Sequence, residues 1–167
     1  MKIALIGRSG AGKTTLADHL QNEYGFFVCR TGVRCRQLAR EFFDTEDKST
    51  LQAISDGMRR IDSLVWLRAA LREVPHGTEN IVVDSIRTVE EHDNIRALGY
   101  VVWRVTSSQA LRFERLMSRG QTYSLEKDEG HATEMSLDNV MVDLEFENNR
   151  QSLTAIHEAI REALGAQ

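Results

Sequence analysis

The eight residues from Gly7 to Thr14 have the types and the spacing that bind phosphate groups. They read G-x-x-x-x-G-K-T, and they lie between an apolar run and a helical pattern. Glycines allow the backbone to turn its N–H groups toward one point, where a lysine and a helix N-terminus add positive charge. We therefore predict a nucleotide-phosphate site made by Gly7, Ser9, Gly10, Ala11, Gly12, Lys13, Thr14 and Thr15.

The same site predicts a bound magnesium ion. The motif assigns the hydroxyl of Thr14 to the metal. Asp84 ends the apolar run 81–83, and an acid at such a strand end holds the metal through water or accepts a proton from an attacking hydroxyl. A helix cap is the alternative for Asp84. We expect Thr14 and Asp84 at the metal, and Lys13 and Asp84 in catalysis.

Arginines follow several of the predicted strands, and a guanidinium binds phosphate oxygens with two parallel hydrogen bonds. The arginines with this placement are Arg30, Arg34, Arg36, Arg87, Arg112, Arg115 and Arg119. A solvated surface charge is the alternative for each of them. The polar segment after Arg119 contains two glycines, and we expect a short lid over about residues 119–134 that excludes water during group transfer.

The elements that must position these residues alternate along the chain. Apolar runs predict strands at residues 3–6, 26–29, 81–83, 100–105 and 144–147. Helical periodicity predicts helices at residues 14–24, 34–43, 51–73, 89–98, 110–118 and 152–164. This alternation predicts an α/β fold in which a doubly wound parallel five-stranded sheet carries helices on both faces. Ligands bind such sheets outside the carboxyl ends of the strands.

Composition limits the classes of partner. The chain has 167 residues, 41% of them hydrophobic and 28% charged, which fits a single domain with its own core. A formal net charge of −4 makes DNA a less favoured partner than a small molecule. No apolar run has membrane-spanning length, and no signal peptide or paired-cysteine metal motif is present. We expect a cytoplasmic protein without membrane association.

Together these motifs resemble the P-loop nucleoside monophosphate kinases, most closely the phage-type deoxynucleoside monophosphate kinases. Adenylate kinases and dephospho-CoA kinases are more distant in this resemblance, which covers nearly the whole chain. Besides the glycine loop, the segments that carry it are Leu51-Gln52 with Asp56, Arg59, Asp62 and Trp66, then Asp84-Ser85-Ile86-Arg87, His131-Ala132-Thr133-Glu134, and Asn148.

The resemblance implies a P-loop NTPase fold with acceptor-binding helices at about residues 31–75 and ATP and Mg²⁺ as cofactors. It implies that Asn148 lies near the ATP base and that Arg115 and Arg119 act in catalysis on the transferring group. The residues that it assigns to the acceptor are Thr31, Arg36, Arg59, Arg87 and Glu134. The implied reaction is transfer of the γ-phosphoryl group of ATP to a nucleoside or deoxynucleoside monophosphate or a close nucleotide analogue.

Departures from the family pattern leave other acceptors open. Adenylate kinases carry an acid where this chain has Val33, and the segment from Asp84 to Arg87 lacks their glycine and proline. A hydroxymethylated pyrimidine, free or in DNA, and dephospho-CoA are therefore alternatives. A regulatory NTPase that hydrolyses its nucleotide slowly while engaging a protein partner is a further alternative, from another functional class.

Overall fold

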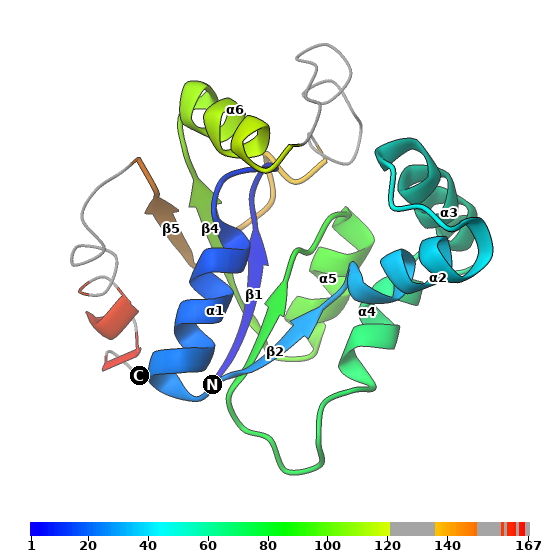
Figure 1. Cartoon of the computed structure of the whole chain (residues 1–167). Helices are drawn as coiled ribbons and strands as arrows, with labels where there is room; N and C mark the ends of the chain where they lie inside the picture. Colours follow the sequence, from blue (N-terminus) through cyan, green and yellow to red (C-terminus); the bar gives the residue numbers. More distant parts are fainter. Residues whose placement is uncertain (121–135, 150–157, 159, 163, 166–167) are drawn as a thin grey trace.

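A five-stranded parallel sheet forms the centre of the computed structural model (Figure 1), which describes residues 1–120, 136–149, 158, 160–162 and 164–165. Its strands are β1 (Lys2–Ile6), β2 (Phe27–Arg30), β3 (Ile81–Asp84), β4 (Val101–Thr106) and β5 (Leu144–Glu147). They lie in the order β2-β3-β1-β4-β5, and every neighbouring pair is parallel. Because the chain adds strands on both sides of β1, the carboxyl end of β1 is where a ligand crevice is expected.

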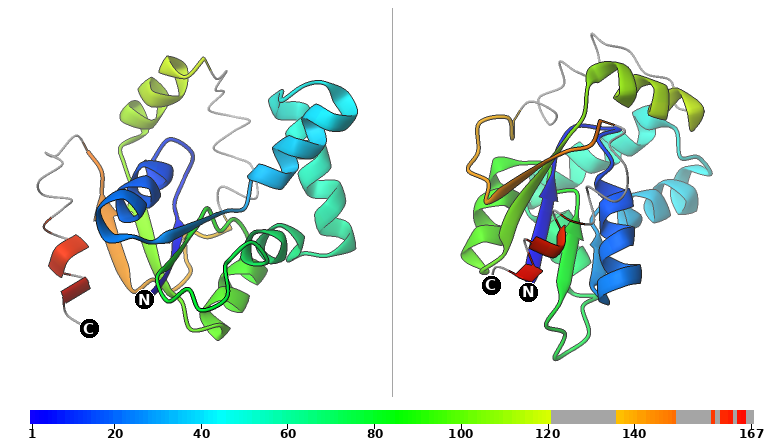
Figure 2. Two further views of the ribbon diagram at one scale, coloured as in Figure 1. Left: turned by 60° about the horizontal axis from the view of Figure 1, so that its bottom comes forward. Right: turned by 90° about the vertical axis from the view of Figure 1, so that its left-hand side faces the viewer.

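The sheet is buried on both faces. Ile3 and Leu5 pack with helix α1 (Lys13–Tyr24), whereas Ala4 and Ile6 belong to a second apolar cluster with α4 (Val65–Leu71) and α5 (Val89–Ala97). This alternation follows from the two-residue period of a strand. Figure 2 shows α1 and α5 on opposite sides of the strands. The predicted doubly wound parallel sheet is therefore confirmed.

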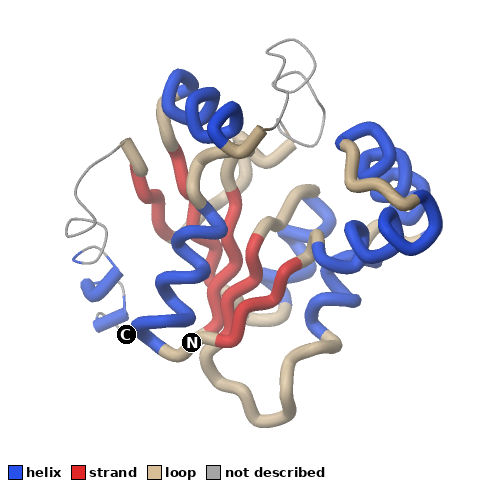
Figure 3. Tube along the Cα trace, in the orientation of Figure 1, coloured by secondary structure: helices blue, strands red, loops and turns tan. Residues whose placement is uncertain are grey.

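The remaining helices are α2 (Val33–Phe43), α3 (Lys48–Ile61) and α6 (Gln109–Ser118). Helices α2 and α3 form a hairpin beyond the carboxyl end of β2, at one side of the sheet (Figure 3). No residue of α3 is fully buried. Helix α6 follows β4 and lies over the carboxyl ends of the central strands (Figure 1). The α2–α3 hairpin and α6 therefore lie on either side of the carboxyl end of β1.

The predicted continuous helix over residues 51–73 is wrong, because the chain breaks there into α3 and α4. Asp62 has an extended backbone, with φ −145° and ψ 112°, and its carboxylate accepts a hydrogen bond of 2.9 Å from the N–H of Leu64. A short acidic side chain competes in this way with the backbone hydrogen bonds of a helix. The helical spacing of apolar residues continues through Asp62, so the sequence pattern did not indicate the break.

Two predicted segments lie mainly outside the described residues. These are the lid at about 119–134, of which only its first two positions are described, and the helix at 152–164. Within the described part of the chain, no helix is long and apolar enough to cross a membrane.

Candidate active site

The glycine loop connects the end of β1 to the start of α1, as its pattern predicts. Gly7, Gly10 and Gly12 have φ values of 139°, 79° and 104°, in the region that side chains rarely adopt. A Cβ atom at Gly7 would lie 2.2 Å from the carbonyl oxygen of Val105, and one at Gly12 would lie 2.2 Å from Nδ2 of Asn148. The loop therefore depends on glycine for both its conformation and its close packing.

Lys13 and Thr14 begin α1 and point to different parts of the loop site. The ammonium of Lys13 donates to the carbonyl oxygens of Gly7 at 2.5 Å and Arg8 at 3.1 Å, so it crosses the mouth of the loop. The hydroxyl of Thr14 donates to Oδ2 of Asp84 at 2.9 Å. This contact is possible because β3, which ends at Asp84, is the direct neighbour of β1.

A hydroxyl and a buried carboxylate thus meet at one point, and oxygen ligands of this kind suit Mg²⁺. The described residues contain no group of three or more His, Cys, Asp or Glu side chains that could hold a metal ion alone. Mg²⁺ commonly keeps several waters and shares phosphate oxygens with its substrate. Thr14 and Asp84 therefore fit a magnesium ion that arrives with a nucleotide.

Arg30 also contacts Asp84, and sequence reasoning gave it no separate role. Its Nη1 lies 3.4 Å from Oδ2 of Asp84, and its Nη2 bonds to Asp18 on α1. The signal that could have found this contact is strand register, since Arg30 and Asp84 are partners at the ends of β2 and β3. Register across two strands follows from pairing, which spacing along the chain does not show.

A cleft of about 930 Å³ extends from the glycine loop to the α2–α3 hairpin. On the loop side, Gly7, Ser9, Ala11 and Lys13 line it. On the far side it is lined by four of the residues predicted to bind an acceptor, Thr31, Arg36, Arg59 and Arg87, and by the mainly apolar side chains of Cys35, Leu51, Trp66 and Ile86. The fifth predicted acceptor residue, Glu134, lies outside the described part of the chain.

Three arginines come together on the acceptor side of the cleft, which is the part lined by Thr31, Arg36, Arg59 and Arg87, and the acids Glu46, Asp47 and Asp56 also line the cleft. Burial raises the pKa of the Cys35 thiol, although Arg87, Arg36 and Arg59 each act to lower it. All three guanidiniums interact electrostatically with this one thiol, so their charges converge on this part of the cleft. Such a concentration of arginine suits a phosphate or carboxylate group.

Glu91 organises two of the three arginines and was not assigned a role from sequence. This fully buried residue accepts a hydrogen bond of 3.3 Å from Nη2 of Arg59 and one of 2.8 Å from the backbone N–H of Arg87. Its own N–H donates to Oγ1 of Thr88, the N-cap of α5, at 3.2 Å. The pattern Thr88-x-x-Glu91 is a capping-box signature, which indicates the helix start and not the contact with Arg59.

Thr31 joins the ends of β2 and β3. Its buried hydroxyl donates to the carbonyl oxygens of Ser85 at 2.9 Å and Asp84 at 3.3 Å. Ser85 has a φ of 75°, a conformation that is uncommon for a residue other than glycine. The strand end that presents Asp84 is therefore fixed by a strained turn and by a neighbouring hydroxyl.

Arg115 and Asn148 lie against the carbonyl side of the glycine loop. Arg115 donates to the carbonyl oxygens of Gly10 at 3.3 Å and Ala11 at 3.4 Å, and to that of Asn148 at 3.0 Å. The amide of Asn148 donates to Ala11 at 2.9 Å. In this arrangement both side chains hold the shape of the loop. Arg119 is exposed at the C-cap of α6, where the predicted lid begins.

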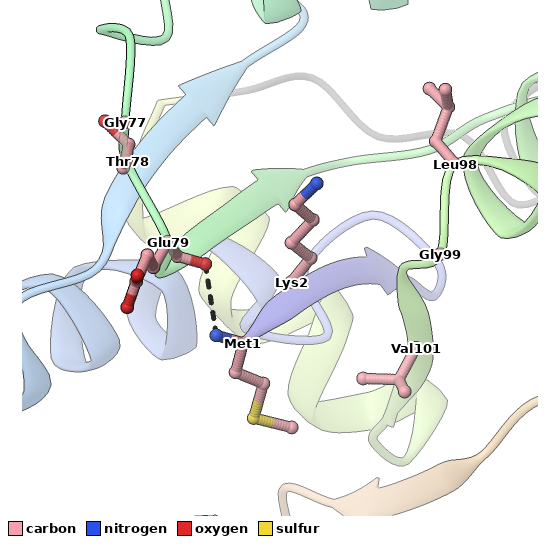
Figure 4. A pocket seen from close by; sticks show the side chains of 8 residues that line it. All are labelled: Met1, Lys2, Gly77, Thr78, Glu79, Leu98, Gly99 and Val101. Atoms are coloured by element: carbon pink, nitrogen blue, oxygen red, sulfur yellow. Dashed lines mark hydrogen bonds between the residues drawn. The ribbon is translucent and has the colours of Figure 1, made fainter.

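A second cavity lies at the opposite edge of the sheet and contains none of these residues (Figure 4). It has a volume of about 670 Å³ and is lined by the amino ends of β1 and β4 and by loop residues such as Gly77 and Glu79. The amino group of Met1 donates to the carbonyl oxygen of Glu79 at 3.0 Å. Its polar lining side chains are Lys2, Thr78 and Glu79, and it has neither the glycine loop nor the arginines of the cleft, so it is the weaker candidate for a site of chemistry.

A glycine loop that enters a helix at the carboxyl end of a parallel sheet defines the class of P-loop nucleotide-binding proteins. A family model described as an AAA domain matches residues 3–149. The chain therefore belongs to this family. No curated protein sequence matches the chain significantly.

Solved structures with the same fold include several kinases. A gluconokinase from Sinorhizobium meliloti 1021 has a TM-score of 0.62 and 19% identity, with 98% of this chain and 89% of that chain covered. A deoxyadenosine kinase from M. mycoides, with products bound, has a TM-score of 0.59 and 17% identity, with 99% of both chains covered. A shikimate kinase from Acinetobacter baumannii has a TM-score of 0.61 and 15% identity, with 99% and 93% covered. At these identities the likeness establishes the shared fold.

Proposed function

We propose that this protein is a kinase that transfers the γ-phosphoryl group of Mg-ATP to a nucleoside or deoxynucleoside monophosphate. The observation that carries the proposal is the continuous cleft, with a phosphate loop at one side and converging arginines at the other. Two anion sites that face one cleft suit a reaction in which one phosphate group is passed to another. In-line phosphoryl transfer needs this kind of positioning and charge neutralisation more than covalent chemistry.

The charges on the acceptor side favour a phosphorylated acceptor. Arg59 is paired with the buried carboxylate of Glu91, whereas no ion pair of Arg36 or Arg87 occurs among the described residues. These two guanidiniums can therefore pair with an anionic ligand, in a cleft that Asp56 also lines. A phosphate monoester carries nearly two negative charges at neutral pH, and a carboxylic acid carries one. A nucleoside monophosphate matches this charge better than a neutral sugar or a monocarboxylate.

The mainly apolar wall of the same cleft provides a surface for a base. It consists of Cys35, Leu51, Trp66 and Ile86, beside the arginines that would hold the phosphate. The deoxyadenosine kinase of the same fold was determined with the products dCMP and dCDP bound, which supports a ligand from the nucleoside and nucleotide class for this fold. The phage-type deoxynucleoside monophosphate kinases, which the sequence resembles, remain the proposed subgroup.

On the donor side, we assign the ATP phosphates to the loop N–H groups and Lys13, and the magnesium ion to Thr14 and Asp84. The bound metal neutralises charge on the phosphate oxygens during transfer. Arg115 and Asn148 keep the loop N–H groups directed toward the phosphates through their bonds to the loop carbonyls. Arg119 and Glu134 are proposed to join the site from the lid.

The test is ADP release from Mg-ATP in the presence of one acceptor at a time, with products identified by mass. The panel contains ribo- and deoxynucleoside monophosphates, nucleosides, gluconate, shikimate, dephospho-CoA and hydroxymethylated DNA. We expect a nucleoside monophosphate to gain one phosphate, and the Lys13→Ala variant to give none. A phosphorylated sugar acid, cofactor precursor or DNA would replace the proposed acceptor. If free phosphate is the product with every acceptor tested, the assignment would change from a kinase to a regulatory NTPase.

A further inference from the structure

Arg30 differs from the other arginines near the site in the groups that it contacts. Arg36, Arg59 and Arg87 line the cleft, but Arg30 does not. Its guanidinium instead bridges two acids, Asp84 at the end of β3 and Asp18 on α1. Asp18 lies one helical turn after Thr14 on α1. The Arg30 bridge therefore joins the same helix and the same carboxylate that the bond between Thr14 and Asp84 joins.

This bridge balances the charges beside the proposed metal site. Arg30 pairs with both Asp18 and Asp84, and Lys13 bonds to the nearby loop carbonyls, so the formal charges of these four side chains sum to zero. The Asp84 side chain is only 8% exposed, and its partner Arg30 is 31% exposed. Charges that are partly removed from water interact more strongly than charges on the surface. A free divalent cation therefore gains little from Asp84 while Arg30 is bound to it.

A nucleotide changes this balance because its phosphates bring several negative charges to the loop. We propose that Arg30 is a positioning residue that neutralises Asp84 in the empty protein and thereby makes metal binding depend on a bound nucleotide. The inference rests on the proposed function in one respect, the assignment of Asp84 to the metal. It also explains why an arginine occupies the end of β2 without lining the cleft.

The experiment measures Mn²⁺ affinity, because Mn²⁺ is a paramagnetic substitute for Mg²⁺ whose free concentration can be read by electron paramagnetic resonance. Titrations are made with and without ADP, and no acceptor or turnover is required. For the wild type we expect weak binding of Mn²⁺ alone and much tighter binding with ADP. In Arg30→Gln, binding of Mn²⁺ alone should tighten about tenfold or more, since a unit charge near the metal has been removed.

Three controls make the result specific to the bridge. Arg34→Gln removes the same charge from the start of α2, where Arg34 pairs with Glu73 at 2.8 Å, and it should leave Mn²⁺ affinity unchanged. The double variant Arg30→Gln, Asp84→Asn should lose the gain. Arg30→Met keeps the aliphatic volume of the side chain and should reproduce the gain, so a folding defect in one variant does not prevent a decision.

The inference is overturned if a folded Arg30→Gln or Arg30→Met variant binds Mn²⁺ alone no more tightly than the wild type. It is also overturned if the gain persists when Asp84 is replaced. Failure of the proposed function would give a different experimental result. A protein that phosphorylates no nucleotide in the acceptor panel, but shows the tenfold gain in Mn²⁺ affinity, loses the kinase assignment and keeps the role of Arg30.

Discussion

In the proposed function, the loop side and the acceptor side of the cleft would bind anions by different means. On the loop side the backbone would provide most of the contacts to phosphate, since three glycines hold conformations that other residues rarely adopt. Val105, Arg112 and Asn148 pack closely against these glycines. On the acceptor side the arginine side chains would bind the anion, and α3, which carries Arg59, has no fully buried residue. A site made by the backbone fixes one phosphate geometry. Side chains on a lightly packed hairpin can be replaced without disturbing the core, so proteins of this fold could differ in acceptor while they keep the same phosphate donor.

The largest expected effect breaks the loop side. Lys13→Ala removes the ammonium that crosses the mouth of the loop, and turnover should fall by about three orders of magnitude or more. The fold should remain, because the ammonium bonds to the carbonyl oxygens of Gly7 and Arg8 in the loop, and Lys13 does not belong to either apolar cluster. The measurement is kcat for the best acceptor, with circular dichroism and melting temperature as the control for folding. Turnover near the wild-type value would remove Lys13 from the mechanism.

The second largest expected effect comes from breaking the contact between Arg59 on the acceptor side and Glu91 on α5. Glu91→Ala leaves Arg59 without its buried partner, and breaking such a pair costs about 3 kcal/mol of unfolding free energy. Urea denaturation measures this loss. The acceptor KM should also rise, while the KM for ATP stays unchanged, because Glu91 bonds only to acceptor-side groups among the contacts described. An equal rise in both KM values would indicate general damage and not loss of the arginine arrangement.

A smaller effect tests the acceptor side directly. Arg87→Ala removes an exposed guanidinium from the cleft and should raise the acceptor KM about tenfold or more, because a charge-assisted hydrogen bond contributes about 1.5–3 kcal/mol. Arg34→Ala is the matched control, since Arg34 is also exposed but does not line the cleft. Steady-state kinetics with varied acceptor gives the result. An unchanged acceptor KM in Arg87→Ala would place the phosphate elsewhere.

The smallest effect concerns the turn between the two sides. Ser85 has a φ of 75°, which glycine adopts without strain. Ser85→Gly should therefore stabilise the protein by about 0.5–1 kcal/mol, although the mutation also loosens the unfolded chain. Thermal and urea denaturation measure the change. A loss of stability would show that the 3.3 Å contact of the Ser85 hydroxyl with Asp84 outweighs the backbone strain.

The sequence predicted the loop side better than the acceptor side, for a physical reason. The glycine loop and Asp84 are local signals, since each follows directly from a strand and ends at the same edge of a parallel sheet. The strand pattern also predicted the whole sheet. By contrast, the break at Asp62, the bridge from Arg30 to Asp84 and the contact of Glu91 with Arg59 depend on packing between elements. Spacing along the chain carries no information about such contacts.

The hydrogen bonds that complete the loop side join residues far apart in the chain. Thr14 and Asp84 are separated by 70 positions, and Ala11 and Asn148 by 137. The strand pairs of the sheet are similarly far apart, since Lys2 pairs with Ile81 and Ile3 with Val101, and closing loops of this length is slow. These hydrogen bonds therefore cannot form before the sheet itself. A partly folded chain therefore possesses the glycine sequence but lacks the arrangement that grips phosphate. Nucleotide binding in a refolding experiment should consequently report the last step of assembly, after secondary structure has formed.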